Sequence, residues 1–115
     1  MPEYTPHDAE QDGVSFIQTW TMPDADHVDR WLQTMHDHIH VLTSLPGFRS
    51  MALYRGLDDH HTAVHARWDT LDDLQAGRDL EPAKLAHTEL LRWGTETGTT
   101  YTLDRTYGPA SKRKH

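Results

Sequence analysis

Cysteine is absent from this chain of 115 residues, and that absence removes several kinds of chemistry at once. Without thiols there is no disulfide framework, no thiolate metal site and no cysteine nucleophile. Basic residues are also scarce, because 11 lysines and arginines stand against 18 aspartates and glutamates and leave a net charge of −7. Such a surplus of acid repels phosphate backbones and anionic lipids, so we expect neither a nucleic-acid nor a membrane partner.

Long hydrophobic runs are missing as well. No segment approaches the roughly 20 apolar residues of a membrane-spanning helix, and the N-terminus has no signal-peptide core. Glycine-rich nucleotide loops, Gly-x-Ser-x-Gly elbows and strand lysines placed for a Schiff base are absent too. The expectation is a soluble, cytoplasmic protein that, as an enzyme, uses neither a dinucleotide nor a covalent nucleophile.

The length suits a single domain. We predict a flexible arm over residues 1–13, a folded domain over residues 14–107 and a disordered tail over residues 108–115. Alternating apolar residues predict the strands, whereas apolar stripes and terminators such as Pro46-Gly47 predict the helices. The predicted strands span residues 14–22, 48–55, 62–68 and 99–106, and the predicted helices span residues 25–44, 70–77 and 82–93.

This order predicts an α+β fold, a ferredoxin-like split βαβ with a four-stranded antiparallel sheet. The strands at 14–22 and 62–68 are then central, and the helices cover one face of the sheet. The other face needs a cover, which a second sheet supplies most economically, with Ile17 and Leu53 among the residues expected there. We therefore expect a homodimer that closes into a dimeric α+β barrel.

Ten histidines invite a metal hypothesis. His36 and His40 share a helix face, but they lie off the apolar stripe and no glutamate stands between them as in a metalloprotease helix. His60 and His61 fall in a turn between two strands. All four are expected at the surface, and no metal site is predicted.

Three polar or aromatic residues stand among apolar neighbours where a ligand could lie. Gln18 interrupts the apolar face of a central strand, and a buried amide without a partner costs about 1–3 kcal/mol, so it should bond either the protein or a ligand. Trp68 ends a strand beside small residues, and His87 lies near apolar positions of the last helix. We take these three as candidate catalytic residues, with ordinary packing as the alternative for each. The residues expected to bind substrate are Phe16, Trp20, Trp31, Met35 and Val64.

Four motifs carry a family resemblance in their order and spacing. They are Val14-Ser-Phe-Ile-Gln-Thr-Trp20, Leu45-Pro-Gly-Phe48, Ala66-Arg-Trp-Asp-Thr70 and Glu81-Pro-Ala83. Over about residues 14–107 the chain resembles the antibiotic biosynthesis monooxygenase family. The resemblance implies a dimeric α+β barrel that oxidises compact aromatic molecules, here an aromatic polyketide intermediate of antibiotic biosynthesis.

Two branches of that family are open at this point. The resemblance to cofactor-independent oxygenases implies that Trp68 lines the cavity, although Val64 stands where that branch has an asparagine. The resemblance to heme-degrading members places Gln18, Gly77 and His87 at that branch's asparagine, tryptophan and histidine ligand. A polyketide cyclase and a non-catalytic ligand-binding protein are also compatible with the same fold.

The oxygenase hypothesis has a simple chemistry. A cavity base, or the substrate's own acidity, yields a phenolate or enolate that gives one electron to dioxygen. The radical pair then recombines in an apolar cage, and loss of water leaves a quinone. The amide of Gln18 and the indole N–H of Trp68 are the expected oxyanion donors, with His87 as proton acceptor. No cofactor is expected on this hypothesis, whereas heme is the cofactor expected for the heme-degrading branch.

Overall fold

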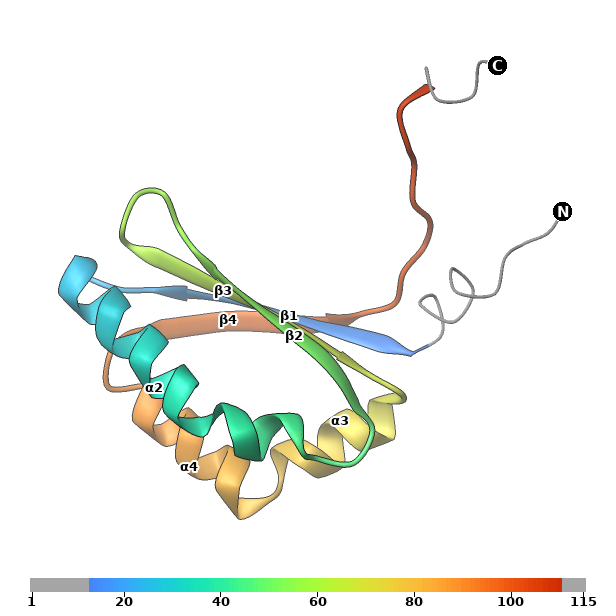
Figure 1. The fold of residues 1–115 in the computed structure, drawn as a ribbon, viewed down its shortest axis with the longest axis horizontal. Helices are drawn as coiled ribbons and strands as arrows, with labels where there is room; N and C mark the ends of the chain where they lie inside the picture. The colour runs from blue at the N-terminus through green and yellow to red at the C-terminus, as the bar shows by residue number, and fades with distance from the viewer. Residues whose placement is uncertain (1–12, 111–115) are drawn as a thin grey trace, which may run out of the picture.

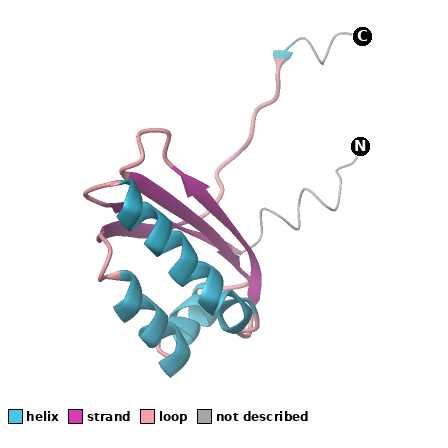
Figure 2. Ribbon diagram, turned by 60° about the vertical axis from the view of Figure 1, so that its left-hand side comes forward, coloured by secondary structure: helices cyan, strands magenta, loops and turns pink. Residues whose placement is uncertain are grey.

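The structure is a computed structural model, and it describes residues 13–110. Most of the predicted arm at 1–13, and residues 111–115 of the predicted tail, lie outside the described residues. Over the rest, three helices lie on one face of a four-stranded antiparallel sheet (Figure 1; Figure 2). The strands are β1 (Val14–Thr21), β2 (Phe48–Arg55), β3 (His61–Trp68) and β4 (Thr95–Tyr101), and the helices are α2 (Ala25–Thr43), α3 (Leu71–Arg78) and α4 (Glu81–Leu90).

The spatial order of the strands is β2-β3-β1-β4, so β1 and β3 are central, as the sequence predicts. This order confirms the ferredoxin-like α+β fold. Gln18 lies near the centre of the sheet. It is opposite Val64 of β3 on one side and opposite Gly98 of β4 on the other. Directly opposed residues share a sheet face, so these three positions all face the helices.

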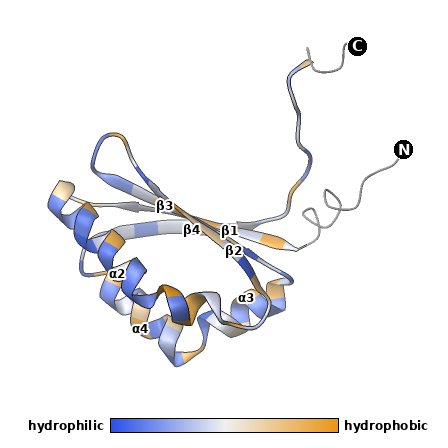
Figure 3. Cartoon of the chain, in the orientation of Figure 1, coloured by the Kyte–Doolittle hydropathy of each residue, from blue (hydrophilic) through white to orange (hydrophobic). Residues whose placement is uncertain are grey.

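Helices α2 and α3 each begin after a residue whose side chain caps the helix. At the start of α2 the Asp24 carboxylate accepts a hydrogen bond from the backbone N–H of His27, at 2.9 Å. Thr70 caps α3 in the same way, with its hydroxyl accepting from the backbone N–H of Asp73 at 3.0 Å. Helices α2 and α4 carry both hydrophobic and hydrophilic residues around their circumference (Figure 3). Burial of the apolar side against the sheet supplies most of their stability.

The core lies between the sheet and α2. Trp20, Val28 and Trp31 have no exposed surface, and Met35 is 3% exposed. A second cluster of Ala66, Trp68 and Leu74 lies beneath α3. Burial of large aromatic side chains is the main favourable term in a domain of this size.

The prediction for the last strand is wrong at both ends. Strand β4 begins at Thr95 rather than residue 99 and ends at Tyr101 rather than residue 106. Gly98 interrupts the alternation on which the prediction depended, yet it pairs with Gln18 within the strand. Glycine suits this position because an added Cβ would lie only 3.2 Å from the Cβ and Cγ of Gln18. Helix α4 likewise ends at Leu90 rather than residue 93, since the chain tightens into i→i+3 bonds such as Trp93 N–H to the Leu90 carbonyl, at 3.0 Å.

The sheet face away from the helices is uncovered in a single chain. Ile17 is 38% exposed on it, as expected, and it lies opposite His65 of β3. The prediction for Leu53 is wrong, because Leu53 lies opposite Val64 and packs against the main core. Among the described residues, no helix is long and apolar enough to cross a membrane.

Candidate active site

A cavity of about 420 Å³ lies between the sheet and the three helices. Six of the eight residues predicted for a functional site line it together: Phe16, Gln18, Met35, Val64, Trp68 and His87. Most of the remaining wall is aliphatic, with Leu42, Leu45, Met51 and Leu74 among its members. The space therefore suits a largely apolar molecule with a few polar atoms.

Trp20 and Trp31 do not line this cavity. Both are fully buried in the core, where their ring centroids lie 5.6 Å apart. The alternation of β1 places Trp20 on the correct face, but there its ring packs against Trp31 of α2 and the His87 ring of α4. Its contribution to the site is indirect, because the Trp20 indole Nε1–H donates a hydrogen bond of 2.8 Å to Oε1 of Gln18.

Gln18 connects the core to a second polar group. Its Nε2 atom donates to a carboxylate oxygen of Glu96, and the other oxygen of the same carboxylate contacts Nε2 of His87. The side chain of Glu96 is 26% exposed and that of His87 is 47% exposed, so the group runs from the buried core to the protein surface. Sequence reasoning missed Glu96, because the predicted strand began after it.

Trp68 presents an unused donor. Its side chain is 6% exposed, and its Nε1 atom is buried with no hydrogen-bond partner among the described residues. The ring is held edge to face against Phe48, with centroids 5.5 Å apart. An unpaired buried N–H costs about 1–3 kcal/mol, and a ligand atom that accepts a hydrogen bond would recover part of it.

The charged residues known to line the cavity are basic, although the chain as a whole is acidic. Arg78 and Lys84 line the cavity, and no aspartate or glutamate among the described residues does. The guanidinium carbon of Arg78 lies 5.0 Å from the centre of the Phe16 ring, a cation–π contact between two residues of the cavity wall. A second hollow, which includes Glu96 and Gly98, shares Phe16, Gln18 and Arg78 with the first. The cavity wall is thus favourable for an anionic oxygen.

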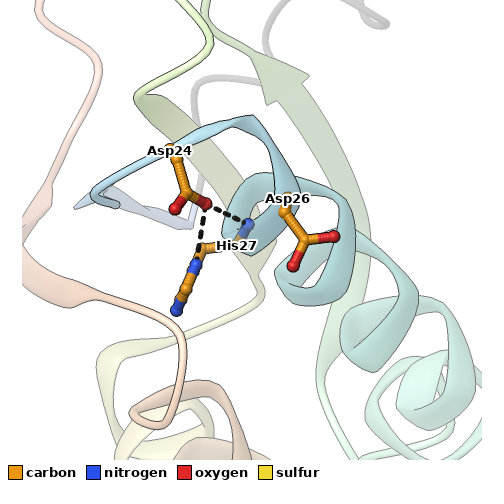
Figure 4. A group of neighbouring side chains, drawn as sticks. All are labelled: Asp24, Asp26 and His27. Atoms are coloured by element: carbon orange, nitrogen blue, oxygen red, sulfur yellow. Dashed lines mark hydrogen bonds and ion pairs between the residues drawn. The ribbon is translucent and has the colours of Figure 1, made fainter.

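A separate group of metal-ligand type lies at the start of α2 and is explained by helix capping. Asp24, Asp26 and His27 lie close together there (Figure 4). Asp24 accepts hydrogen bonds from both the backbone N–H and the ring Nδ1 of His27, and these bonds hold the pKa of Asp24 below its usual range. Asp26 pairs with Arg30 at 2.9 Å. His36, His40, His60 and His61 are all exposed, as expected, but His61 is the first residue of β3 rather than part of the turn.

Comparison with solved structures identifies the fold. The cofactor-independent oxygenase SnoaB from Streptomyces nogalater matches with a TM-score of 0.74 and 20% sequence identity, over 83% of this chain and 96% of that one. The monooxygenase ActVA-Orf6 of Streptomyces coelicolor, in complex with the ligand nanaomycin D, matches with a TM-score of 0.76 and 13% identity, over 92% and 100% of the two chains. A conserved protein from Methanosarcina mazei matches with a TM-score of 0.70 and 10% identity, over 81% and 95%.

The chain therefore has the fold of the antibiotic biosynthesis monooxygenases, as the sequence motifs indicated. Identities of this size establish the fold alone. No family model matches the sequence, and no curated protein matches it. The function must accordingly be argued from the cavity.

Gly77 tests how tightly the cavity wall is packed. Glycine to alanine in a helix ordinarily stabilises by about 0.5–1 kcal/mol. Here the new Cβ would lie 2.9 Å from Cη2 of the buried Trp68 ring, and such overpacking costs about 1–3 kcal/mol. We predict that Gly77→Ala lowers the free energy of unfolding by about 1 kcal/mol, measured by urea denaturation. Gly108→Ala, which meets open space, is the control and should have no effect; a more stable Gly77→Ala protein would show that the wall yields easily.

Proposed function

We propose that this protein is a cofactor-independent monooxygenase that converts a phenolic, anthrone-type aromatic polyketide to a quinone. The observation that carries the proposal is an apolar cavity lined by both Gln18 and Trp68, in which the indole N–H of Trp68 is buried and has no partner among the described residues. Two of the structures with this fold are an oxygenase described as cofactor-independent and a monooxygenase, which supports the same chemistry here. We place the reaction in antibiotic biosynthesis and in the cytoplasm.

The reaction balances without a cofactor. Removal of a proton from the anthrone methylene gives an electron-rich carbanion, delocalised as a phenolate or enolate. This anion gives one electron to dioxygen, and the resulting carbon radical and superoxide combine to form a C–O bond. Protonation gives a hydroperoxide, and loss of one water molecule leaves the quinone carbonyl. One oxygen atom of dioxygen thus enters the product and the other leaves as water.

The protein's part is to hold the substrate, exclude water and stabilise developing charge. Trp68 and Gln18 donate hydrogen bonds to the substrate oxyanion, and His87 accepts the proton. Arg78 and Lys84 add favourable potential for the anion, because no acidic side chain of the described residues offsets them on the cavity wall. Phe16, Met35 and Val64 form apolar surfaces against the rings.

The residues present do not fit heme. A heme-degrading site in this fold would use His87 as the iron ligand, but the Nε2 atom of His87 is held by Glu96. Gly77 stands where that branch has a tryptophan, and even an added Cβ there would lie 2.9 Å from the Trp68 ring. A cyclase would use the same wall and base without oxygen, and no observation on this cavity favours it over the oxygenase.

Substitution of the two hydrogen-bond donors in the cavity tests the proposal directly. We predict that Trp68→Phe, assayed for quinone formation from dihydroxyanthrone, lowers kcat by about ten-fold or more through loss of one N–H donor. Gln18→Leu should also lower kcat while the protein stays folded. Trp93→Phe is the matched control, because Trp93 uses its indole N–H on Thr34 outside the cavity, at 3.1 Å. Unchanged kinetics in both cavity variants would place the reaction elsewhere.

We further propose that the enzyme is a homodimer joined through the uncovered sheet faces. Ile17, Tyr54 and Tyr101, which are 38%, 56% and 49% exposed, support this face as the contact. Light scattering at micromolar concentration should give about twice the 13.3 kDa chain mass. Ile17→Glu should yield monomers, whereas Leu85→Glu, on the exposed side of α4, should not. A monomeric parent protein at that concentration would contradict the dimer.

A further inference from the structure

We infer that Glu96 is a positioning residue that fixes His87 in the tautomer with hydrogen on Nε2, leaving Nδ1 as the proton acceptor. The inference deepens the function proposed above and rests on it for the identity of the base. It concerns a residue on the last strand that no sequence motif indicated. The observation behind it is a hydrogen-bonded chain of four side chains: Trp20, Gln18, Glu96 and His87.

The sheet register brings these side chains together. Glu96 of β4 lies opposite Trp20 of β1, two residues from the pair formed by Gln18 and Gly98. Both pairs face the helices, so the carboxylate of Glu96 lies between the strand that carries Gln18 and the helix that carries His87. Gly98 has no side chain, and this leaves room for the Cβ and Cγ atoms of Gln18.

The direction of each hydrogen bond follows from what the groups can do. An indole N–H only donates, so the Gln18 atom that it contacts must be the amide oxygen. The amide nitrogen then faces Glu96, where it donates to one carboxylate oxygen. An ionised carboxylate only accepts, so the Nε2 atom of His87 must carry a hydrogen to bond the other oxygen.

This assignment leaves one free acceptor. In a neutral imidazole with hydrogen on Nε2, the lone pair lies on Nδ1, which has no hydrogen-bond partner among the described residues. The Nδ1 lone pair is therefore carried by a residue that lines the main cavity, where the substrate would bind. A carboxylate that selects the tautomer of a histidine base is worth orders of magnitude in turnover where it has been removed in other enzymes.

Glu96→Gln provides an unusually sharp test, because it is close to isosteric and can keep both contacts only by reversing one of them. The new amide oxygen can accept from Gln18. The new amide nitrogen must then donate to Nε2 of His87, which moves the histidine hydrogen to Nδ1 and removes the free acceptor. We expect a tautomer switch in a folded protein, with kcat for dihydroxyanthrone lowered by about ten-fold or more and KM nearly unchanged.

The tautomer is read by ¹⁵N NMR of the histidine ring at alkaline pH, where imidazoles are neutral. The control is Glu89→Gln, because Glu89 forms the same kind of pair with His38, at 2.9 Å, and neither residue lines the cavity. That variant should change the His38 signals and leave both the His87 signals and kcat unchanged.

The possible outcomes separate the two proposals. Hydrogen on Nε2 of His87 in the parent protein, on Nδ1 in Glu96→Gln, and a matching loss of kcat would support the inference. Hydrogen on Nδ1 in the parent protein, or a switched tautomer with unchanged kcat, would overturn it while the oxygenase proposal stands. A parent protein that never oxidises the anthrone would overturn the oxygenase proposal and, with it, the role given to Glu96.

Discussion

The hydrogen bond from the Trp20 indole to the Gln18 amide is the interaction on which the candidate site depends. Trp20 is fixed by complete burial, so its N–H direction is set by the core rather than by the cavity. The bond then fixes the amide of Gln18, and the amide helps to fix the carboxylate of Glu96. A polar group held in this way needs little rearrangement when charge develops beside it, which is the condition for electrostatic stabilisation of a transition state.

The charges of the site agree with this arrangement. The chain has a net charge of −7, yet Arg78 and Lys84 line this cavity and Glu96 lies on the adjoining hollow. An aromatic anion would therefore meet cations and N–H donors on the cavity wall. Glu96 stays satisfied by Gln18 and His87 rather than facing the anion alone. Because the basic side chains and the Glu96 carboxylate occupy different positions, one site can hold an anion and a proton acceptor together.

Sequence patterns predicted most of the fold, because the strands and helices near the centre obey their periodicities. The alternation of β1 and β3 assigned Gln18, Val64 and Trp68 to one face, and the register confirms that assignment. A periodic pattern shows which face of an element a residue is on but not how deeply it is buried. Trp20 and Trp31 were therefore expected on the cavity wall, although they pack against each other in the closed core. Glu96 was missed for a different reason: Gly98 breaks the alternation of β4, and only the pairing with β1 shows that the strand continues through it.

The central claim is that this cavity oxygenates an aromatic anion with dioxygen alone. Its most direct test is turnover of dihydroxyanthrone under ¹⁸O₂ by protein treated with a chelator and supplied with no flavin or heme. We expect quinone that carries one ¹⁸O atom in the new carbonyl, with the second atom in water and a rate well above that of the buffer. Quinone without the label, or turnover that begins only when hemin or flavin is added, would contradict the claim.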